Sequence, residues 1–94
     1  MRVRQWPVEH IHVYLEPVDM RKSIDGLAAI VELELKLSPF APALFVFCNR
    51  SRDKVKLLYW ERNGFVLWYK RLEKQRFRWP KQLSLVSAEQ LSWL

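Results

Sequence analysis

The sequence contains only two glycines, one cysteine and no long apolar run. Gly26 and Gly64 are too few for a glycine-rich phosphate loop, and they predict short connections between elements. The single Cys48 excludes an intrachain disulfide and offers no spacing for a zinc site. No segment reaches the roughly 20 consecutive apolar residues of a membrane helix. Residues 1–7 are basic, but no apolar segment follows them, so we expect no secretory signal and a reduced, cytoplasmic setting.

The 94 residues form one small domain, 1–94, and half of them are apolar, which is enough to build a core. The formal net charge is +6, and it is unevenly distributed. Residues 1–49 hold five Lys/Arg and six Asp/Glu, whereas residues 50–94 hold eleven Lys/Arg and four Asp/Glu. This concentration of positive charge indicates a polyanionic partner such as nucleic acid, although a solvated basic surface is the simpler alternative.

The first half of the chain predicts a strand followed by a helix. Residues 10–15 have the β-branched and aromatic character of a strand that Pro17 ends. Asp19 can then accept hydrogen bonds from the first amides of a helix that ends before Pro39. Residues 31–37 also alternate as a strand would, but their Glu, Leu and Lys content favours helix. The apolar face of this helix consists of Ile24, Leu27, Ala28, Val31 and Leu35.

The second half predicts three further strands. Residues 44–48 form a continuous apolar run, which is typical of a central, buried strand. Residues 54–60 and 65–72 flank Asn63-Gly64, the strongest short-range signal for a type I′ hairpin turn. A turn at these two residues would pair Trp60 with Leu67 on one face of the hairpin.

The C-terminal quarter predicts two short elements. Residues 77–80 fit an edge strand, because Pro80 would be poorly tolerated in a central one. Ser87 and Gln90 fit a capping box that begins a terminal helix over residues 88–94, and the missing C-cap predicts a natural chain that continues. We therefore expect an α+β domain with a largely antiparallel sheet of four to five strands, one helix after the first strand and one C-terminal helix.

No group of side chains predicts a catalytic site. Asp19 and Asp25 are six residues apart, which does not place them together on a helix, and no serine has a histidine nearby in the sequence. His10 and His12 point to one face of a strand and could bind a metal, but two partly exposed strand histidines are the simpler interpretation. We expect no enzymatic activity, no metal and no cofactor.

The stronger signal is a series of cations in two segments. Arg50, Arg52 and Lys54 lie in a polar connection, and a second group follows the hairpin. Phe77 and Trp79 are interleaved with this second group, so the segment offers phosphate contacts and stacking planes. Alternatively, the two aromatic residues belong to the core, and the arginines between them are solvated. The second group comprises Lys70, Arg71, Lys74, Arg76, Arg78 and Lys81.

Four ordered segments resemble one known family. Residues 19–27 read Asp-Met-Arg-Lys-Ser-Ile-Asp-Gly-Leu, and residues 76–80 read Arg-Phe-Arg-Trp-Pro. Between them, residues 44–60 and 64–73 continue the similarity. From about residue 11 to residue 94, the chain resembles the second-open-reading-frame protein, usually called TnpB, of insertion-sequence-66 type transposons.

This resemblance implies an accessory role in the transposition of a bacterial mobile element, beside a larger transposase that carries the acidic catalytic residues. It places residues 19–26 at the start of the first helix, where Arg21 and Lys22 could hold a DNA phosphate together with the helix amides. Ser51 stands where the family commonly has a basic residue, and residues 61–64 replace a turn that is richer in glycine.

Three hypotheses follow. In the first, the protein binds the DNA ends of the element and assists the transposase. In the second, it is an adaptor that docks on the transposase through Trp60, Trp68 or Tyr69 without touching DNA. The third, a nuclease, requires metal-dependent cleavage that no motif predicts. The sequence leaves open whether copies of the chain associate. The phosphate contacts of the first hypothesis are Arg21, Lys22, Arg50, Arg52, Lys54, Arg71, Lys74, Arg76 and Arg78.

Overall fold

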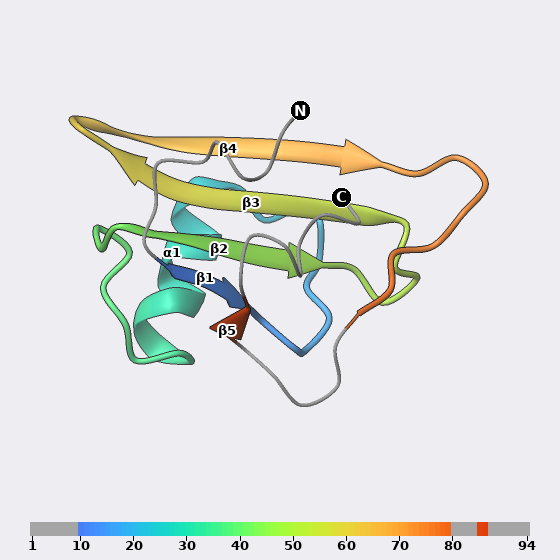
Figure 1. Cartoon of the computed structure of the whole chain (residues 1–94), viewed down its shortest axis with the longest axis horizontal. Coiled ribbons are helices and arrows are strands. Elements are labelled where there is room, and N and C mark those ends of the chain that lie inside the picture. The colour runs from blue at the N-terminus through green and yellow to red at the C-terminus, as the bar shows by residue number, and fades with distance from the viewer. Residues whose placement is uncertain (1–9, 80–84, 87–94) are drawn as a thin grey trace.

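The computed structural model describes residues 10–79 and the backbone of residues 85–86. The predicted C-terminal helix, Pro80 and Lys81 lie outside these residues. Among the described residues, the one α-helix, α1, is too short to span a membrane. The elements are β1 (His10–Val13), α1 (Ile24–Leu33), β2 (Ala43–Cys48), β3 (Lys54–Glu61), β4 (Gly64–Arg71) and β5 (Leu85–Val86) (Figure 1).

The four longer strands form one sheet in the order β4-β3-β2-β1, with α1 packed against one face (Figure 1). The two residues of β5 pair antiparallel with β1 at its outer edge. The α+β class and the helix after the first strand are thus confirmed. The expectation of a largely antiparallel sheet needs one correction, because β1 and β2 are parallel. The helical crossover returns the chain to the end from which β1 started, so β2 runs in the same direction and the sheet is mixed.

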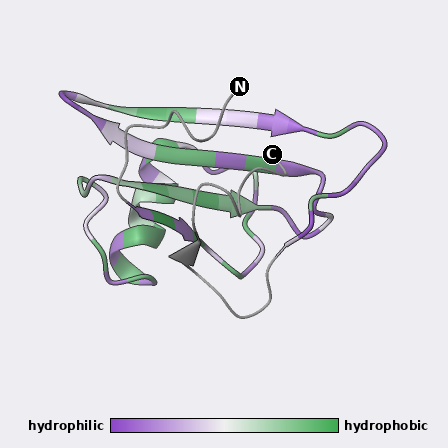
Figure 2. Ribbon diagram, viewed as in Figure 1, coloured by the Kyte–Doolittle hydropathy of each residue, from purple (hydrophilic) through white to green (hydrophobic). Residues whose placement is uncertain are grey.

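Strand β2 is the centre of the core, as its apolar run predicts. All six of its residues are buried. Alternate side chains serve opposite faces, so Phe45 and Phe47 pack with Leu27 and Val31 of α1. Figure 2 shows the apolar residues concentrated on β2 and α1, whereas hydrophilic residues lie at the strand ends and in the connections. Helix α1 therefore covers one face of the sheet, and an apolar layer fills the space between the helix and that face.

The second face of the sheet is covered in part by residues 75–79. Phe77 and Trp79 pack on Val46, Leu57 and their neighbours in this layer, and both are buried. The indole Nε1 of Trp79 donates to the carbonyl oxygen of Tyr14 at 3.2 Å. The expected edge strand over residues 77–80 is wrong for residues 77–79, which have no regular secondary structure. The apolar spacing that suggested a strand comes instead from two side chains that anchor an irregular segment.

The start of the helix differs from expectation. Helix α1 begins at Ile24, with Ser23 at the N-cap position, rather than at Asp19. The Asp19 carboxylate instead accepts the backbone amide of Arg21 at 2.9 Å, which closes a turn before the helix. At the other end, the helical interpretation of residues 31–37 holds as far as Leu33. Lys36 then adopts a left-handed conformation with φ of 58°, which turns the chain out of the helix.

The hairpin is present, but its turn lies one residue earlier than the Asn63-Gly64 signal predicts. Glu61 pairs with Gly64, so the turn residues are Arg62 and Asn63, and Arg62 has a φ of 56°. The pairing therefore shifts by two residues, which keeps every side chain on its expected face. The reason is aromatic packing. A turn at Asn63-Gly64 would set Phe65 opposite Arg62, whereas the observed register sets it opposite Trp60, with ring centroids 5.0 Å apart.

Candidate nucleic-acid interface

The β2–β3 connection, residues 49–53, is held by one asparagine side chain. The side-chain oxygen Oδ1 of Asn49 accepts hydrogen bonds from the backbone amides of Asp53 and Lys54, both at 3.1 Å. Its Nδ2 donates to the Asp53 carboxylate at 2.7 Å, and this bond keeps the pKa of that carboxyl below its ordinary value. The loop that carries Arg50 and Arg52 is therefore an ordered turn built around Asn49.

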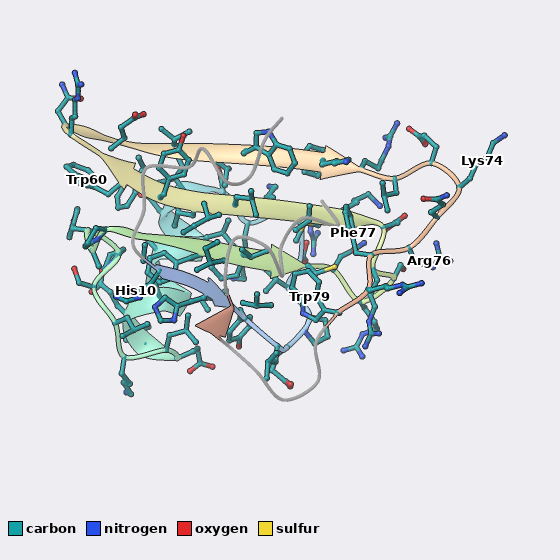
Figure 3. The ribbon with its side chains drawn as sticks, viewed as in Figure 1. His10, Trp60, Lys74, Arg76, Phe77 and Trp79 are labelled. Carbon is teal, nitrogen blue, oxygen red and sulfur yellow. The ribbon has the colours of Figure 1, made fainter. Side chains whose placement is uncertain are left out.

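Two backbone hydrogen bonds attach the chain that follows β4 to this loop. The amide of Leu72 donates to the Asp53 carbonyl, and the amide of Phe77 donates to the Arg52 carbonyl, each at 2.7 Å. The two cationic segments of the sequence thus lie together at the end of the sheet where β2 ends and β3 begins. Figure 3 shows Lys74 and Arg76 at this end of the sheet, with Trp60 at the opposite end. The cationic end consists of Arg50, Arg52, Lys54, Arg71, Lys74, Arg76 and Arg78.

Few of these charges are neutralised by neighbours. Arg71 pairs with Glu73 at 2.7 Å, and Lys54 approaches Asp53 at 3.5 Å. Both pairs are at least partly solvated, and such pairs contribute little free energy. Within residues 10–79, the other five members of the cationic end form no ion pair and are exposed: Arg50, Arg52, Lys74, Arg76 and Arg78.

Arg21 and Lys22 lie near this end but differ in their surroundings. The Arg21 guanidinium binds the Asp19 carboxylate with contacts of 3.0 and 2.6 Å, and these bonds lower the pKa of Asp19 to about 2. Arg21 also lines a groove of about 610 Å³ together with Arg50 and Lys54. Lys22 does not line this groove. The structure therefore brings Arg21 to the cationic end as half of an ion pair.

Lys56 is a structural cation that the sequence reasoning did not select. Its ammonium group donates to the carbonyl oxygens of Met20 and Lys22, each at 2.7 Å, and it lies 5.7 Å from the centre of the Tyr69 ring. These bonds tie the turn before α1 to the β3–β4 hairpin. One sequence signal was available. Lys56 lies in an apolar strand, on the face that packs against α1. A lysine at such a position needs hydrogen-bond partners for its ammonium group.

The three aromatic residues proposed for an adaptor surface do not share one surface. Trp68 packs on the face opposite α1, together with Leu57 and Val55. Trp60 and Tyr69 are on the α1 side, but Trp60 is next to the hairpin turn and Tyr69 is paired with Lys56 near the cationic end. Trp60 instead forms a cluster with Phe40 and Phe65, with ring centroids 4.9 to 5.4 Å apart.

The histidines and the cysteine take no part in the cationic end. His10 and His12 share one face, with ring centroids 6.2 Å apart, and His12 stacks on Phe45. Among the described residues, no three His, Cys, Asp or Glu side chains lie close enough to hold a metal ion. Cys48 is buried, as expected, and burial raises the pKa of its thiol to about 11.

Replacing Asn49 with alanine should lower the free energy of unfolding by about 1–3 kcal/mol, because the amides of residues 53 and 54 and the Asp53 carboxylate lose their shared partner. Chemical denaturation of the purified variant would measure the change. Asn63→Ala, at the exposed hairpin turn, is the matched control and should change stability by less than about 0.5 kcal/mol. Equal losses in the two variants would contradict the central role of Asn49.

His12 should make the fold less stable under mild acid. Burial, with a smaller effect from His10, lowers the pKa of His12 below its ordinary value of 6.5. The unfolded chain therefore binds more protons than the folded one, so stability is retained above that value and decreases as the pH falls below it. Thermal melting between about pH 7.5 and 5.5 should show this decrease, and His12→Gln should make it shallower. An unchanged slope in the variant would exclude His12 as the cause.

The comparisons with known proteins agree with the motifs. The family model described as IS66 Orf2-like protein matches residues 9–94. The chain belongs to the IS66 Orf2-like family. This confirms the resemblance to the second-open-reading-frame protein of insertion-sequence-66 transposons.

Two curated relatives come from Sinorhizobium fredii (strain NBRC 101917 / NGR234), and both are named as uncharacterized proteins. Protein y4jC is 36% identical over 70 residues, which are 74% of this chain and 60% of that protein. Protein y4hO is 39% identical over 79 residues, which are 81% of this chain and 69% of that protein. The chain thus spans about 60% of the length of y4jC. No solved structure matches this IS66 Orf2-like chain.

Proposed function

We propose that this IS66 Orf2-like protein is a non-catalytic accessory factor of transposition that binds the DNA ends of its insertion element. In this proposal it works in the bacterial cytoplasm beside a separate transposase, and the cationic end contacts DNA phosphates.

The supporting observation is the attachment of the segment after β4 to the β2–β3 loop. The hydrogen bonds from Leu72 to Asp53 and from Phe77 to Arg52 join two cationic segments that the β3–β4 hairpin separates in the sequence. A rigid surface of clustered cations suits a DNA backbone, because neutralising phosphates releases the condensed counterions. Buried anchors, above all Phe77, hold this surface in place without using the arginines themselves.

The proposal assigns no catalytic step to this chain. Asp19 and Asp53, two carboxylates beside the cationic end, are each engaged by a neighbouring donor side chain. A metal-dependent nuclease needs carboxylates that converge on an ion, and these two are instead used to order turns. We therefore place the catalytic carboxylates of the reaction in the transposase.

Fluorescence anisotropy tests the proposal most directly. The purified protein would be titrated into a labelled duplex of the terminal repeat of the element and into a scrambled duplex, each at low and moderate salt. We expect tighter binding to the terminal repeat and a steep loss of affinity with added salt. Failure to bind either duplex at low salt would overturn the proposal. Binding that salt does not weaken would exclude phosphate contacts as its basis.

One observation favours a second candidate, the protein–protein adaptor. Phe40 is exposed where it packs with Trp60 and Phe65, and Leu37, which lines the same hollow as Phe40, is also exposed, so apolar and aromatic surface is concentrated there. Because the family is connected with transposition, the partner of this second candidate is the transposase of the same element. Exposed aromatic residues with apolar neighbours are typical anchors of protein interfaces.

Co-purification of the tagged protein with its transposase tests this second candidate. Phe40→Ala should abolish co-purification, whereas Arg76→Gln at the cationic end should leave it intact. The isolated variants should remain folded, since both side chains are exposed. Co-purification that survives Phe40→Ala would exclude the aromatic cluster as the docking surface.

A further inference from the structure

The groove beside Tyr69 has a composition that phosphate binding alone does not require. It lies between the turn before α1 and the β2–β3 loop, has a volume of about 610 Å³, and is lined by Asp19, Arg50, Lys54 and Tyr69 among others. Its volume is within the range of sites that hold a small molecule. Tyr69 is 48% exposed, although it belongs to a paired strand. Cations and an accessible aromatic ring therefore face the same hollow.

The walls of this groove are fixed in position. Lys56 bonds to the carbonyl oxygens of Met20 and Lys22 on one side and lies over the ring of Tyr69 on the other. The second wall is the β2–β3 loop, which the Asn49 side chain orders. A preformed site of this kind avoids much of the free energy that ordering flexible side chains would cost on binding.

The charges of the groove fit a nucleotide better than a bare anion. Arg50 lines this groove and also a second hollow of about 290 Å³, so a strand that passes from one hollow to the other passes Arg50. The Asp19 carboxylate would repel a phosphate at its own position. It is compensated by Arg21, however, and can accept hydrogen bonds from the amino group of a base.

We propose that the groove beside Tyr69 binds an unpaired nucleotide of single-stranded DNA, with its base against the face of the Tyr69 ring that Lys56 does not cover and its phosphate against Arg50. Bases inside a duplex are already stacked and paired, so they cannot reach this ring. Bases of a single strand can, and stacking on an aromatic side chain together with cationic contacts to the backbone is the usual means of binding it. This inference rests on the proposed DNA-binding function and adds to it a distinct site for strand ends or gaps.

The test compares three labelled probes: an oligodeoxycytidylate, an abasic strand of the same length and a duplex. We expect the wild-type protein to bind the oligodeoxycytidylate more tightly than the abasic strand. Tyr69→Leu should weaken binding to the oligodeoxycytidylate about tenfold and leave duplex binding unchanged, because only the stacked base is lost. Tyr69→Phe should retain wild-type binding, and Phe40→Leu, which changes an exposed aromatic residue at the far end, is the matched control.

The possible outcomes separate the two proposals. Equal affinity for the oligodeoxycytidylate and the abasic strand, or equal losses for duplex and single strand in Tyr69→Leu, would overturn the nucleotide site while duplex binding persists. Circular dichroism would identify a misfolded Tyr69→Leu variant. In that case the nucleotide site is tested by the affinities of the wild-type protein for the oligodeoxycytidylate and the abasic strand. Absence of binding to every probe at low salt would instead overturn the proposed function itself.

Discussion

Replacing Leu27 with alanine should lower the free energy of unfolding by about 2–5 kcal/mol, which is the range for a buried leucine whose cavity cannot collapse. Leu27 is 0% exposed and, together with Val31, packs α1 against the sheet residues Phe45 and Leu58. A domain of this size has a total stability of roughly 5–15 kcal/mol, so the variant should be largely unfolded at a moderately raised temperature. Equilibrium denaturation in urea would measure the change.

Leu33→Ala provides a matched control on the same helix. Leu33 is 66% exposed, and its truncation should change stability by no more than about 0.5 kcal/mol. Equal destabilisation by the two substitutions would contradict the placement of α1 on the sheet, because the fold assigns the two leucines opposite environments. The pair therefore tests the apolar layer between α1 and the sheet.

The central strand and the helix were predictable because their signals are local and have few interpretations. An apolar run over residues 44–48 that starts after Pro42 and ends at the polar Asn49 fits a strand buried on both faces, and the structure buries all of β2. The hairpin register was less predictable. The Asn63-Gly64 signal describes only the preferences of the turn, whereas the packing of Phe65 on Trp60 and Phe40 depends on a loop that lies twenty residues earlier.

In the candidate interface, too, local features were predictable from the sequence, whereas contacts between distant segments were not. The sequence identified both cationic segments, but it contains no sign that backbone bonds from Leu72 and Phe77 would join them. It grouped Trp60, Trp68 and Tyr69 by residue type, although strand alternation together with the hairpin pairing places Trp68 on the opposite face from the other two. The role of Lys56 was missed because a strand lysine is usually solvated, and its two carbonyl partners belong to a turn that precedes the helix.

Replacing both Arg50 and Arg76 with glutamine should weaken binding to terminal-repeat duplex about a hundredfold at roughly 0.1 M salt, since each phosphate contact contributes about tenfold there. The two arginines come from the two segments that the backbone bonds join, and both are exposed. The slope of log affinity against log salt should also decrease by about two, which a general loss of folded protein would not produce. Anisotropy titrations at several salt concentrations would measure both quantities.

The double variant Lys36→Gln/Arg62→Gln removes the same amount of charge at a distance from the cationic end. Lys36 follows α1 and Arg62 is in the hairpin turn, and both have the same left-handed backbone conformation. We expect this variant to bind the duplex within about threefold of wild type and with an unchanged salt slope, because loss of net charge alone affects only the long-range field. Equal losses in the two double variants would mean that overall charge holds the DNA. A loss confined to Arg50 and Arg76 would locate the contact where the two cationic segments meet.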